Sequence, residues 1–264
     1  MCIPVFNGHS TIRQTIESVL NQQYTNFEIV IVDNASTDNT LEIINSFKDP
    51  RIRLISNPFT IPASENWTKC VALARGHWTK LLCADDLLEP TALSDSMNAI
   101  ESHPSAVAVI GSRNVINEIG TEVLASRNLY PEPKLLGHKQ IIDLAISSGT
   151  NPLGESLCIM WQSWITSSVG EFSKVWNYYI DLDYWFRLSV FGDLLVIPNK
   201  VGSFRISSST WTSRLGLSAI IEAKDFYLKH EFFSEVNPVR RFMAVVKASI
   251  RVVARKIFIA VQSN

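Results

Sequence analysis

In the first third of the chain, short apolar runs alternate with segments in which apolar residues recur every three or four positions. The short runs are typical of buried strands, and the wider spacing is typical of helices that cover a sheet. The pattern predicts strands at 3–6, 27–32, 52–55 and 78–83, separated by helices near 11–22, 40–47 and 64–75. Such alternation is typical of a parallel sheet with helices on both faces.

Beyond residue 86 the pattern becomes less regular. It predicts a helix over 90–102, a strand at 106–110, mixed sheet and loop to about 130, helices near 138–147 and 182–191, and a short strand at 194–197. Residues 149–155 are rich in turn formers and too polar for a core, so we expect them to line a cleft. The chain as a whole predicts an α/β fold with a mostly parallel central sheet.

Two of the predicted strands run directly into acidic residues. Asp85 and Asp86 follow the apolar run 78–84, and Asp33 follows 27–32. In open α/β sheets, ligands bind outside the carboxyl ends of the strands, and carboxylate oxygens suit Mn²⁺ or Mg²⁺ that carries a phosphate. The two strand ends predict one nucleotide site. In the alternative interpretation, Asp85 or Asp86 caps the helix that starts at Pro90.

Composition narrows the class of protein. A formal net charge of −1 gives no basic face for phosphates, so we expect no nucleic acid partner. The four cysteines have no Cys-x-x-Cys spacing and the five histidines have no metal-ligand spacing, which argues against zinc and a disulfide framework. No signal-peptide pattern and no run of 18 apolar residues is present, so we expect a cytoplasmic protein. Dinucleotide and P-loop motifs are missing as well.

Several segments, in consistent order, resemble the family 2 inverting glycosyltransferases of GT-A fold. They are residues 4–8, 17–24, 27–38, 84–86, 151–155, 181–188 and 204–206. The resemblance implies metal-assisted transfer of a sugar from a nucleoside diphosphate sugar to a glycan or lipid-linked acceptor, in building a bacterial cell-surface polysaccharide. It also implies a nucleotide-sugar-binding half at 1–111, an acceptor-binding half at 112–210 of the same domain, and a helical tail at 211–264.

The resemblance assigns roles on the donor side. Asp33 would accept a hydrogen bond from a pyrimidine base, with Pro4 and Asn7 shaping the same pocket, which implies a UDP or dTDP donor. In a structural alternative that is compatible with this role, Asp33 and its neighbours form a turn. Asn66 matches an asparagine near the donor, or is an exposed helix residue. Arg205 approaches the diphosphate, or is an ordinary surface arginine.

The predicted metal site departs from the family pattern. Asp85 matches the second acid of the Asp-x-Asp motif, whereas Cys83 replaces the first. Asp85 and Asp86 remain as ligands for Mn²⁺ or Mg²⁺. Many relatives carry a histidine where this chain has Ser207 and Ser208. We therefore expect a thinner metal shell, in which the protein provides fewer ligands and water completes the coordination.

On the acceptor side, the resemblance places Asp181 as the general base that takes the proton of the attacking hydroxyl. One base opposite the leaving group implies direct displacement with inversion. In the alternative, Asp181 and Asp183 interact with the dipole at a helix N-terminus. Glu155 is expected beside the acceptor. Trp185 stacks on a sugar ring, or packs in the core.

The tail predicts an amphipathic basic helix from Val239 to Val261. Its basic face carries Arg240, Lys247, Arg251 and Arg255, and its apolar face carries Phe242, Val246, Ile250, Val253 and Ile257. Such a helix lies on the inner face of the cytoplasmic membrane, which suits a lipid-linked acceptor. In the alternative, it packs on the catalytic domain with its arginines in solvent.

Two other functions use similar residues. A nucleotidyltransferase also places acids at strand ends, but it has no need of Asp181. A non-catalytic scaffold that binds sugar nucleotides would tolerate the departures at Cys83, Ile180 and Ser207, whereas the retained acids Asp33, Asp85, Asp86 and Asp181 favour an enzyme.

Overall fold

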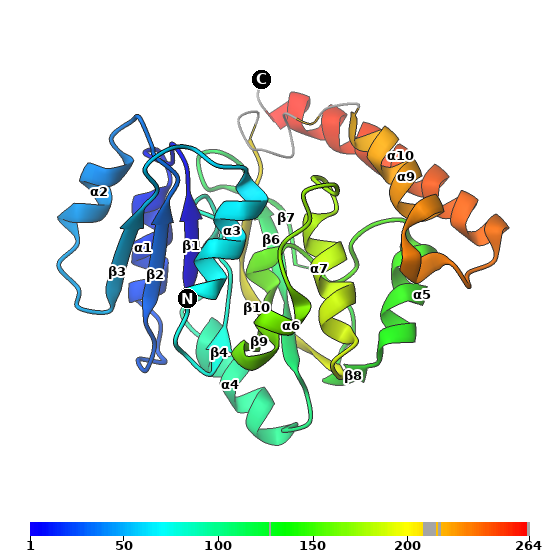
Figure 1. Ribbon diagram of the computed structural model, residues 1–264, viewed down its shortest axis with the longest axis horizontal. Coiled ribbons are helices and arrows are strands. Elements are labelled where there is room, and N and C mark those ends of the chain that lie inside the picture. The colour runs from blue at the N-terminus through cyan, green and yellow to red at the C-terminus, as the bar shows by residue number, and fades with distance from the viewer. Residues whose placement is uncertain (127, 208–214, 216–217, 263–264) are drawn as a thin grey trace.

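The computed structural model describes residues 1–126, 128–207, 215 and 218–262. The first part of the chain forms a parallel three-stranded sheet in the order β1-β2-β3 (Figure 1). Helix α3 lies on one face of this sheet and α1 on the other. The strands are β1 (Cys2–Val5), β2 (Ile29–Asp33) and β3 (Ile52–Ser56), and the helices are α1 (Ile12–Leu20), α2 (Thr40–Ser46) and α3 (Ala63–Ala72).

The second sheet has seven strands and is mixed. Its main path is β4-β9-β6-β10-β5, with β7 paired to β6 and β8 paired to β10. Only β6 and β10 run parallel, and the other pairs are antiparallel. The strands are β4 (Trp78–Thr79), β5 (Leu87–Leu88), β6 (Ala108–Ile116), β7 (Glu122–Leu124), β8 (Lys134–Leu136), β9 (Ile159–Gln162) and β10 (Leu194–Arg205).

The chain passes from one sheet to the other at residues 78–82. Trp78 and Thr79 pair with β9, whereas Leu81 makes a parallel bridge to Cys2 of β1. The Leu82 N–H donates to the Cys2 carbonyl at 2.9 Å. The strand predicted at 78–83 is therefore divided between the sheets, and it delivers residues 83–86 to the edge where β1 and β2 end.

The remaining helices surround the mixed sheet. An aromatic cluster that includes Trp161, Tyr184 and Trp185 fills the space between α7 and β9. The helices are α4 (Ala92–Ser102), α5 (His138–Ser148), η1 (Ser156–Cys158), η2 (Ser163–Ile165), α6 (Thr166–Val169), α7 (Ile180–Ser189), α9 (Ser218–Lys229), η3 (Glu231–Phe233) and α10 (Pro238–Gln262). None of the described helices is long and apolar enough to cross a membrane.

The α/β prediction is confirmed, with two differences of extent. All strand pairs are parallel only in the first sheet, because β5 and β9 join the second sheet antiparallel. The strand predicted at 194–197 continues to Arg205. Pro198 interrupts its pairing with β6 through a register shift, because proline has no N–H to donate, and the strand resumes at Lys200. The boundary predicted at residue 111 falls inside β6.

The tail helix α10 has features of both predicted alternatives, membrane contact and packing on the domain. It packs on α5 and α9, as the second alternative expects. However, its basic residues contact the domain, and its apolar face is the exposed one.

Gly202 allows β10 to approach β5 closely. A Cβ at this position would overlap the Leu87 carbonyl oxygen and lie 2.8 Å from Leu157 Cδ1. We expect Gly202→Ala to lower the free energy of unfolding by about 1–3 kcal/mol, because packed backbone cannot yield to an added methyl. Urea denaturation measures this loss. Gly76→Ala is the control, since its methyl would lie 3.3 Å from the Trp78 carbonyl and needs only a small adjustment. Equal stability of the two variants would contradict the prediction.

Candidate functional site

The carboxyl ends of β1 and β2 carry the first part of the site. Asp33, the last residue of β2, pairs with Val5 of β1 and is 0% exposed. Its Oδ2 accepts a hydrogen bond from the Ser36 N–H at 3.1 Å, which is the turn contact that the sequence predicted. Its Oδ1 is buried and has no partner in the protein. A buried acceptor without a donor is costly, so Asp33 is suited to receive one from a ligand.

The loops that follow β1 and β2 are locked together around Asp33. Asn7 Oδ1 accepts a hydrogen bond from the Thr37 N–H at 2.8 Å, and the Asn7 N–H donates to Ser36 Oγ at 2.9 Å. Asn7 and Ala35 have φ angles of 50° and 57°, a region that costs energy for alanine. Pro4 is buried in the preceding strand. The predicted donor-side residues Pro4, Asn7 and Asp33 therefore lie on two adjacent strands and the loops that follow them.

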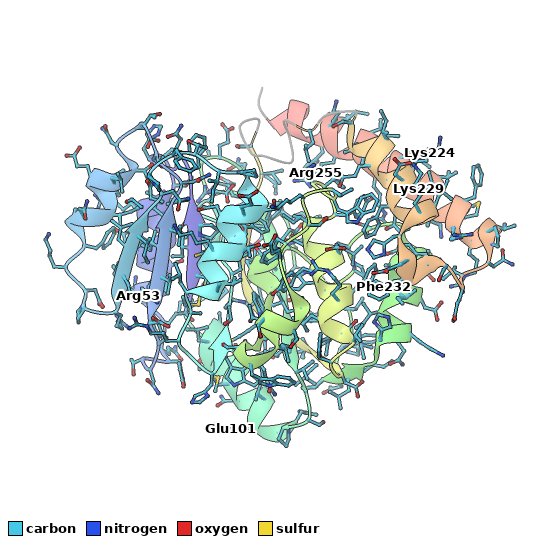
Figure 2. The ribbon with its side chains drawn as sticks, in the orientation of Figure 1. Arg53, Glu101, Lys224, Lys229, Phe232 and Arg255 are labelled. Atoms are coloured by element: carbon cyan, nitrogen blue, oxygen red, sulfur yellow. The ribbon has the colours of Figure 1, made fainter. Side chains whose placement is uncertain are left out.

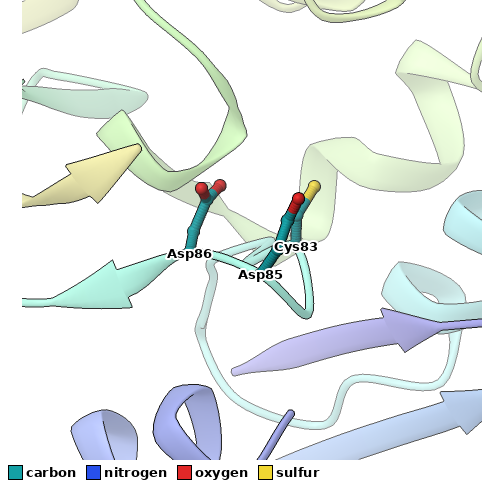
Figure 3. Close-up of side chains that lie close together, drawn as sticks. All are labelled: Cys83, Asp85 and Asp86. Atoms are coloured by element: carbon teal, nitrogen blue, oxygen red, sulfur yellow. The ribbon is translucent and has the colours of Figure 1, made fainter. Parts of the chain in front are cut away.

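The acidic pair lies on a tight turn. The Asp86 N–H donates to the Cys83 carbonyl at 3.1 Å, and Thr15 Oγ1 of α1 lies 2.9 Å from the carbonyl oxygens of both Ala84 and Asp86. The side chains of Cys83, Asp85 and Asp86 project to the same side of the turn (Figure 3). One potential ligand atom from each of these side chains lies within 4.8 Å of the others. Among the described residues, no other group of three or more His, Cys, Asp or Glu side chains is as close together.

Arg205, the last residue of β10, holds this turn in place. Its backbone N–H donates to Asp86 Oδ1 at 2.9 Å, and its Nε donates to the Asp85 carbonyl at 2.8 Å. The rest of the guanidinium donates to the Glu118 carbonyl at 2.9 Å and to Gln14 Oε1 at 2.7 Å. Because Arg205 is 2% exposed, the alternative of a surface arginine is wrong. Its contact with a diphosphate stays a prediction.

The acidic pair does not serve as a helix cap. Helix α4 begins at Ala92, after Thr91, and no side chain makes a cap hydrogen bond there. Ser207, one of the two serines for which the resemblance implied a thinner metal shell, is buried after β10, and Ser208 lies outside the described residues.

Negative charge is concentrated around the turn. Burial, together with the charges of Asp85, Glu155 and Asp181, raises the pKa of the Asp86 carboxyl well above its ordinary value. Burial also raises the pKa of Asp85 and of the Cys83 thiol. Asp86 Oδ2 is buried without a partner. A divalent cation would relieve this repulsion, and the carboxylate oxygens fit Mn²⁺ or Mg²⁺. A protonated thiol is a poor ligand for either ion.

Asp181 lies in the first turn of α7, since this helix begins at Ile180 and not at residue 182. Burial and the charge of Glu155 raise its pKa to about 8, although the Ser156 backbone amide donates a hydrogen bond to it. Its Oδ1 is buried and has no protein partner. Ser156 Oγ lies 3.5 Å from Cys83 Sγ, so short contacts connect Asp181 with the acidic turn.

Glu155 forms a two-point ion pair that the sequence did not predict. Arg113 Nε and Nη2 donate to its carboxylate at 2.6 Å and 2.9 Å. Burial raises the pKa of Glu155, but Arg113 outweighs this effect and lowers it. Arg113 lies in β6, 42 residues from Glu155, so no local motif marks the pair. Its only signal is a charged residue within an apolar strand. The guanidinium groups of Arg113 and Arg255 both lie over the Phe204 ring, at 5.8 Å and 5.6 Å from its centre.

Asn66 belongs to a buried amide network. Its Oδ1 accepts a hydrogen bond from Asn57 Nδ2 at 2.9 Å, and its Nδ2 donates to the Val32 carbonyl at 3.3 Å. Asn34 Oδ1 also accepts from Asn57 Nδ2. Because Asn66 is buried, the alternative of an exposed helix residue is wrong. The network supports the end of β2 beside Asp33.

Two residues of α7 are structural. Trp185 is 0% exposed and packs 5.7 Å from the Trp161 ring, so the core alternative describes it and its ring offers no open face to a sugar. Asp183 accepts from Arg187 Nη2 at 2.6 Å and lies 3.1 Å from His230 Nε2. It ties α7 to the segment after α9.

Comparison with known proteins identifies relatives of this architecture. The family model for Glycosyl transferase family 2 matches residues 1–155. An uncharacterized protein of Mycobacterium tuberculosis is 26% identical over 220 residues, which cover 81% of this chain and 69% of that protein. The Escherichia coli UDP-Glc:alpha-D-GlcNAc-diphosphoundecaprenol beta-1,3-glucosyltransferase WfaP is 37% identical over 100 residues, which cover 38% of this chain and 40% of WfaP.

Solved structures share the fold. Residues 1–349 of Staphylococcus aureus TarS, crystallised with UDP, are 14% identical to this chain with a TM-score of 0.63. The match covers 94% of this chain and 69% of that one. The same TarS fragment with UDP-GlcNAc gives a TM-score of 0.64. The predicted GT-A fold is thereby confirmed.

The Arg205 contacts predict a stability effect. We expect Arg205→Lys to lower the free energy of unfolding by about 2–3 kcal/mol, because lysine cannot reach the separate acceptors and leaves buried groups unpaired. Arg51→Lys is the control, since Arg51 pairs with Asp49 at the surface and should change stability by less than about 1 kcal/mol. Urea denaturation of both variants provides the comparison. Little or no loss in Arg205→Lys would show that the turn does not depend on this side chain.

Proposed function

This chain belongs to glycosyl transferase family 2, and from that premise we propose that it transfers a sugar from a UDP-sugar to a glycan or lipid-linked acceptor with inversion. The observation that carries the proposal is a set of three buried carboxylate oxygens without protein partners, on Asp33, Asp86 and Asp181. The Asp33 oxygen suits the pyrimidine of the donor, the Asp86 oxygen suits a cation, and the Asp181 oxygen suits a hydroxyl of the acceptor. The donor named for WfaP and the nucleotides crystallised with TarS support UDP over dTDP.

The donor is bound by the first half of the site. Asp33 Oδ1 accepts the N–H of the pyrimidine, and Asn7 keeps the surrounding loops in shape through Ser36 and Thr37. Asp85 and Asp86 would hold Mn²⁺ or Mg²⁺, and the bound cation would supply positive charge to neutralise the departing pyrophosphate. Arg205 holds the turn through the Asp86 carboxylate and the Asp85 carbonyl.

Asp181 acts as the general base. Its raised pKa makes it a stronger proton acceptor than an ordinary carboxylate, and its buried Oδ1 is free to receive the acceptor proton. Glu155 stays ionised against Arg113 and keeps negative charge beside the base. Direct displacement by the activated hydroxyl inverts the anomeric centre without a covalent intermediate. The acceptor named for WfaP, a diphosphoundecaprenol-linked sugar, supports a lipid-linked acceptor of polysaccharide assembly.

Thermal shift measurements test the donor and the cation. We expect UDP with Mn²⁺ to raise the melting temperature, since a ligand at about 100 times its Kd stabilises the native state by about 2.7 kcal/mol. Asp85→Asn should remove most of the shift by weakening cation binding. Cys83→Asp should enlarge it, because a carboxylate then replaces the poor thiol ligand. GDP and ADP are the control nucleotides. An equal shift without Mn²⁺, or one unchanged in Asp85→Asn, would argue against the metal assignment.

Asp181→Asn tests the base. We expect transfer to fall by about 10²–10⁴-fold while the UDP shift remains nearly unchanged, because the amide cannot take a proton. In the unaltered protein the rate should rise with pH as Asp181 loses its proton, with a midpoint at or below about 8, since a nearby cation lowers this pKa. Asp183→Asn is the matched control on the same helix and should affect stability more than transfer rate. Full activity of Asp181→Asn would exclude this residue as the base. A pure scaffold would show UDP binding and no transfer in any variant.

A further inference from the structure

Helix α10 runs along one side of the molecule, and its C-terminal end comes near the sheet edge that carries the site (Figure 1). It is held by small residues. Ala244, Ala248 and Val252 are buried, and Ala244 and Ala248 lie close to Gly149 at the end of α5. Such side chains let the helix lie close to the domain while most of its surface remains outside the core.

The cations of α10 help to dock it. Arg240 forms an ion pair with Asp143 of α5 at 2.9 Å. Lys247 Nζ donates to the Ser147 carbonyl at 2.7 Å, and Arg251 Nε donates to the Ser148 carbonyl at 3.1 Å. Arg240, Lys247 and Arg251 nevertheless remain exposed along one border of the helix. Their orientation turns the apolar side of the helix away from the domain.

The exposed side of α10 is a continuous apolar stripe. Phe242 is 59% exposed, Ile250 63% and Ile257 61%, and the members recur at the spacing of one helical face. They extend over nearly the whole helix. The stripe consists of Val239, Phe242, Met243, Val246, Ile250, Val253, Ile257 and Phe258. Large exposed apolar areas of this kind mark surfaces that contact a partner or a membrane.

The positive charge of α10 indicates which kind of partner contacts the apolar stripe. Residues 238–262 contain six Lys or Arg and no Asp or Glu, in a protein whose formal net charge is −1. Arg240, Lys247 and Arg251 border the stripe, which is where cations reach lipid phosphates when an amphipathic helix lies in an interface. An apolar surface of another protein would match the stripe but not this charge. A bilayer that contains anionic lipid matches both.

We propose that the apolar stripe of α10 inserts into the interface of an anionic lipid bilayer, with the helix parallel to the membrane plane. A helix of 25 residues is about 37 Å long, so it offers an extended line of contact. It lies on the membrane and does not cross it, in agreement with its six cations. This docking makes the enzyme peripheral while the rest of the molecule remains in water.

The same helix reaches the site. Arg255 lies on the side of α10 that faces the domain, with its guanidinium over Phe204, next to Arg205 (Figure 2). Its charge also lowers the pKa of Glu155. A bilayer that binds α10 would therefore lie on the side of the molecule where Arg255 meets the acceptor half of the site, which favours a lipid-linked acceptor. This last step rests on the proposed function, whereas the docking itself does not.

Vesicle flotation of the full chain tests the docking. We expect the protein to float with vesicles of phosphatidylcholine and phosphatidylglycerol, and to bind pure phosphatidylcholine much more weakly. Ile250→Glu with Phe242→Glu should reduce binding to anionic vesicles by about tenfold or more, because charges cannot enter the apolar interface. The matched control is Ile119→Glu with Val175→Glu, which adds the same two charges at exposed apolar residues outside α10. Both variants change only exposed side chains and should keep the unaltered melting temperature.

The outcomes separate the proposals. Absence of flotation, or equal flotation of the α10 variant and the control, overturns the docking. Concentration-dependent dimerisation in analytical ultracentrifugation that the α10 variant abolishes, without vesicle binding, assigns the stripe to a second copy and also overturns it. The UDP shift with Mn²⁺ is measured on the same samples and depends on the donor-side residues Asp33, Asp85 and Asp86, none of which lies on α10. Loss of that shift would count against the proposed function alone.

Discussion

The site depends on the hydrogen bonds that Arg205 makes to the turn at residues 83–86. Two elements that are far apart in the sequence meet there, because β10 supplies a backbone N–H for the Asp86 carboxylate and a guanidinium for the Asp85 carbonyl. These bonds hold the Asp86 carboxylate and the Asp85 backbone, while Asp86 Oδ2 has no partner in the protein. The geometry therefore stabilises the turn and leaves one buried carboxylate oxygen unsatisfied.

The concentration of buried acids has a cost that the surrounding structure offsets only in part. Arg113 neutralises Glu155, and Arg205 satisfies one oxygen of Asp86, but the pKa of Asp181 and of Asp86 remains raised. A site in this condition binds cations and donors of hydrogen bonds more readily than a fully compensated one. Cys83 adds no further negative charge to the turn, because burial and the neighbouring carboxylates raise the pKa of its thiol, and it offers no hard oxygen ligand.

Much of the fold follows from local patterns. The alternation of apolar runs and helical spacing predicted β1 to β3 and α1 to α3 within a few residues. The family resemblance assigned Asp33, Asp85, Asp86 and Asp181 to a site, and this assignment stays a prediction. What local patterns could not show depends on contacts across the chain. The division of residues 78–82 between two sheets, the Arg113–Glu155 pair and the buried role of Arg205 all rest on partners more than 40 residues away. The amphipathic pattern of α10 predicted two faces, but which face meets the domain depends on the acceptor groups of α5.

The contact between Asp86 and Arg205 joins residues 119 positions apart, and this separation affects how the protein is made. A chain emerging from the ribosome presents Asp85 and Asp86 long before β10 exists to hold them. Until then the parallel strands β1 to β3 can pair, but the acidic turn lacks the N–H that orders it, and closing so long a loop is slow. The ordering of the acidic turn should therefore appear abruptly and late in synthesis. A ribosome-bound intermediate that ends near residue 155 would contain most of the recognisable motifs and lack the Arg205 contacts that hold the turn.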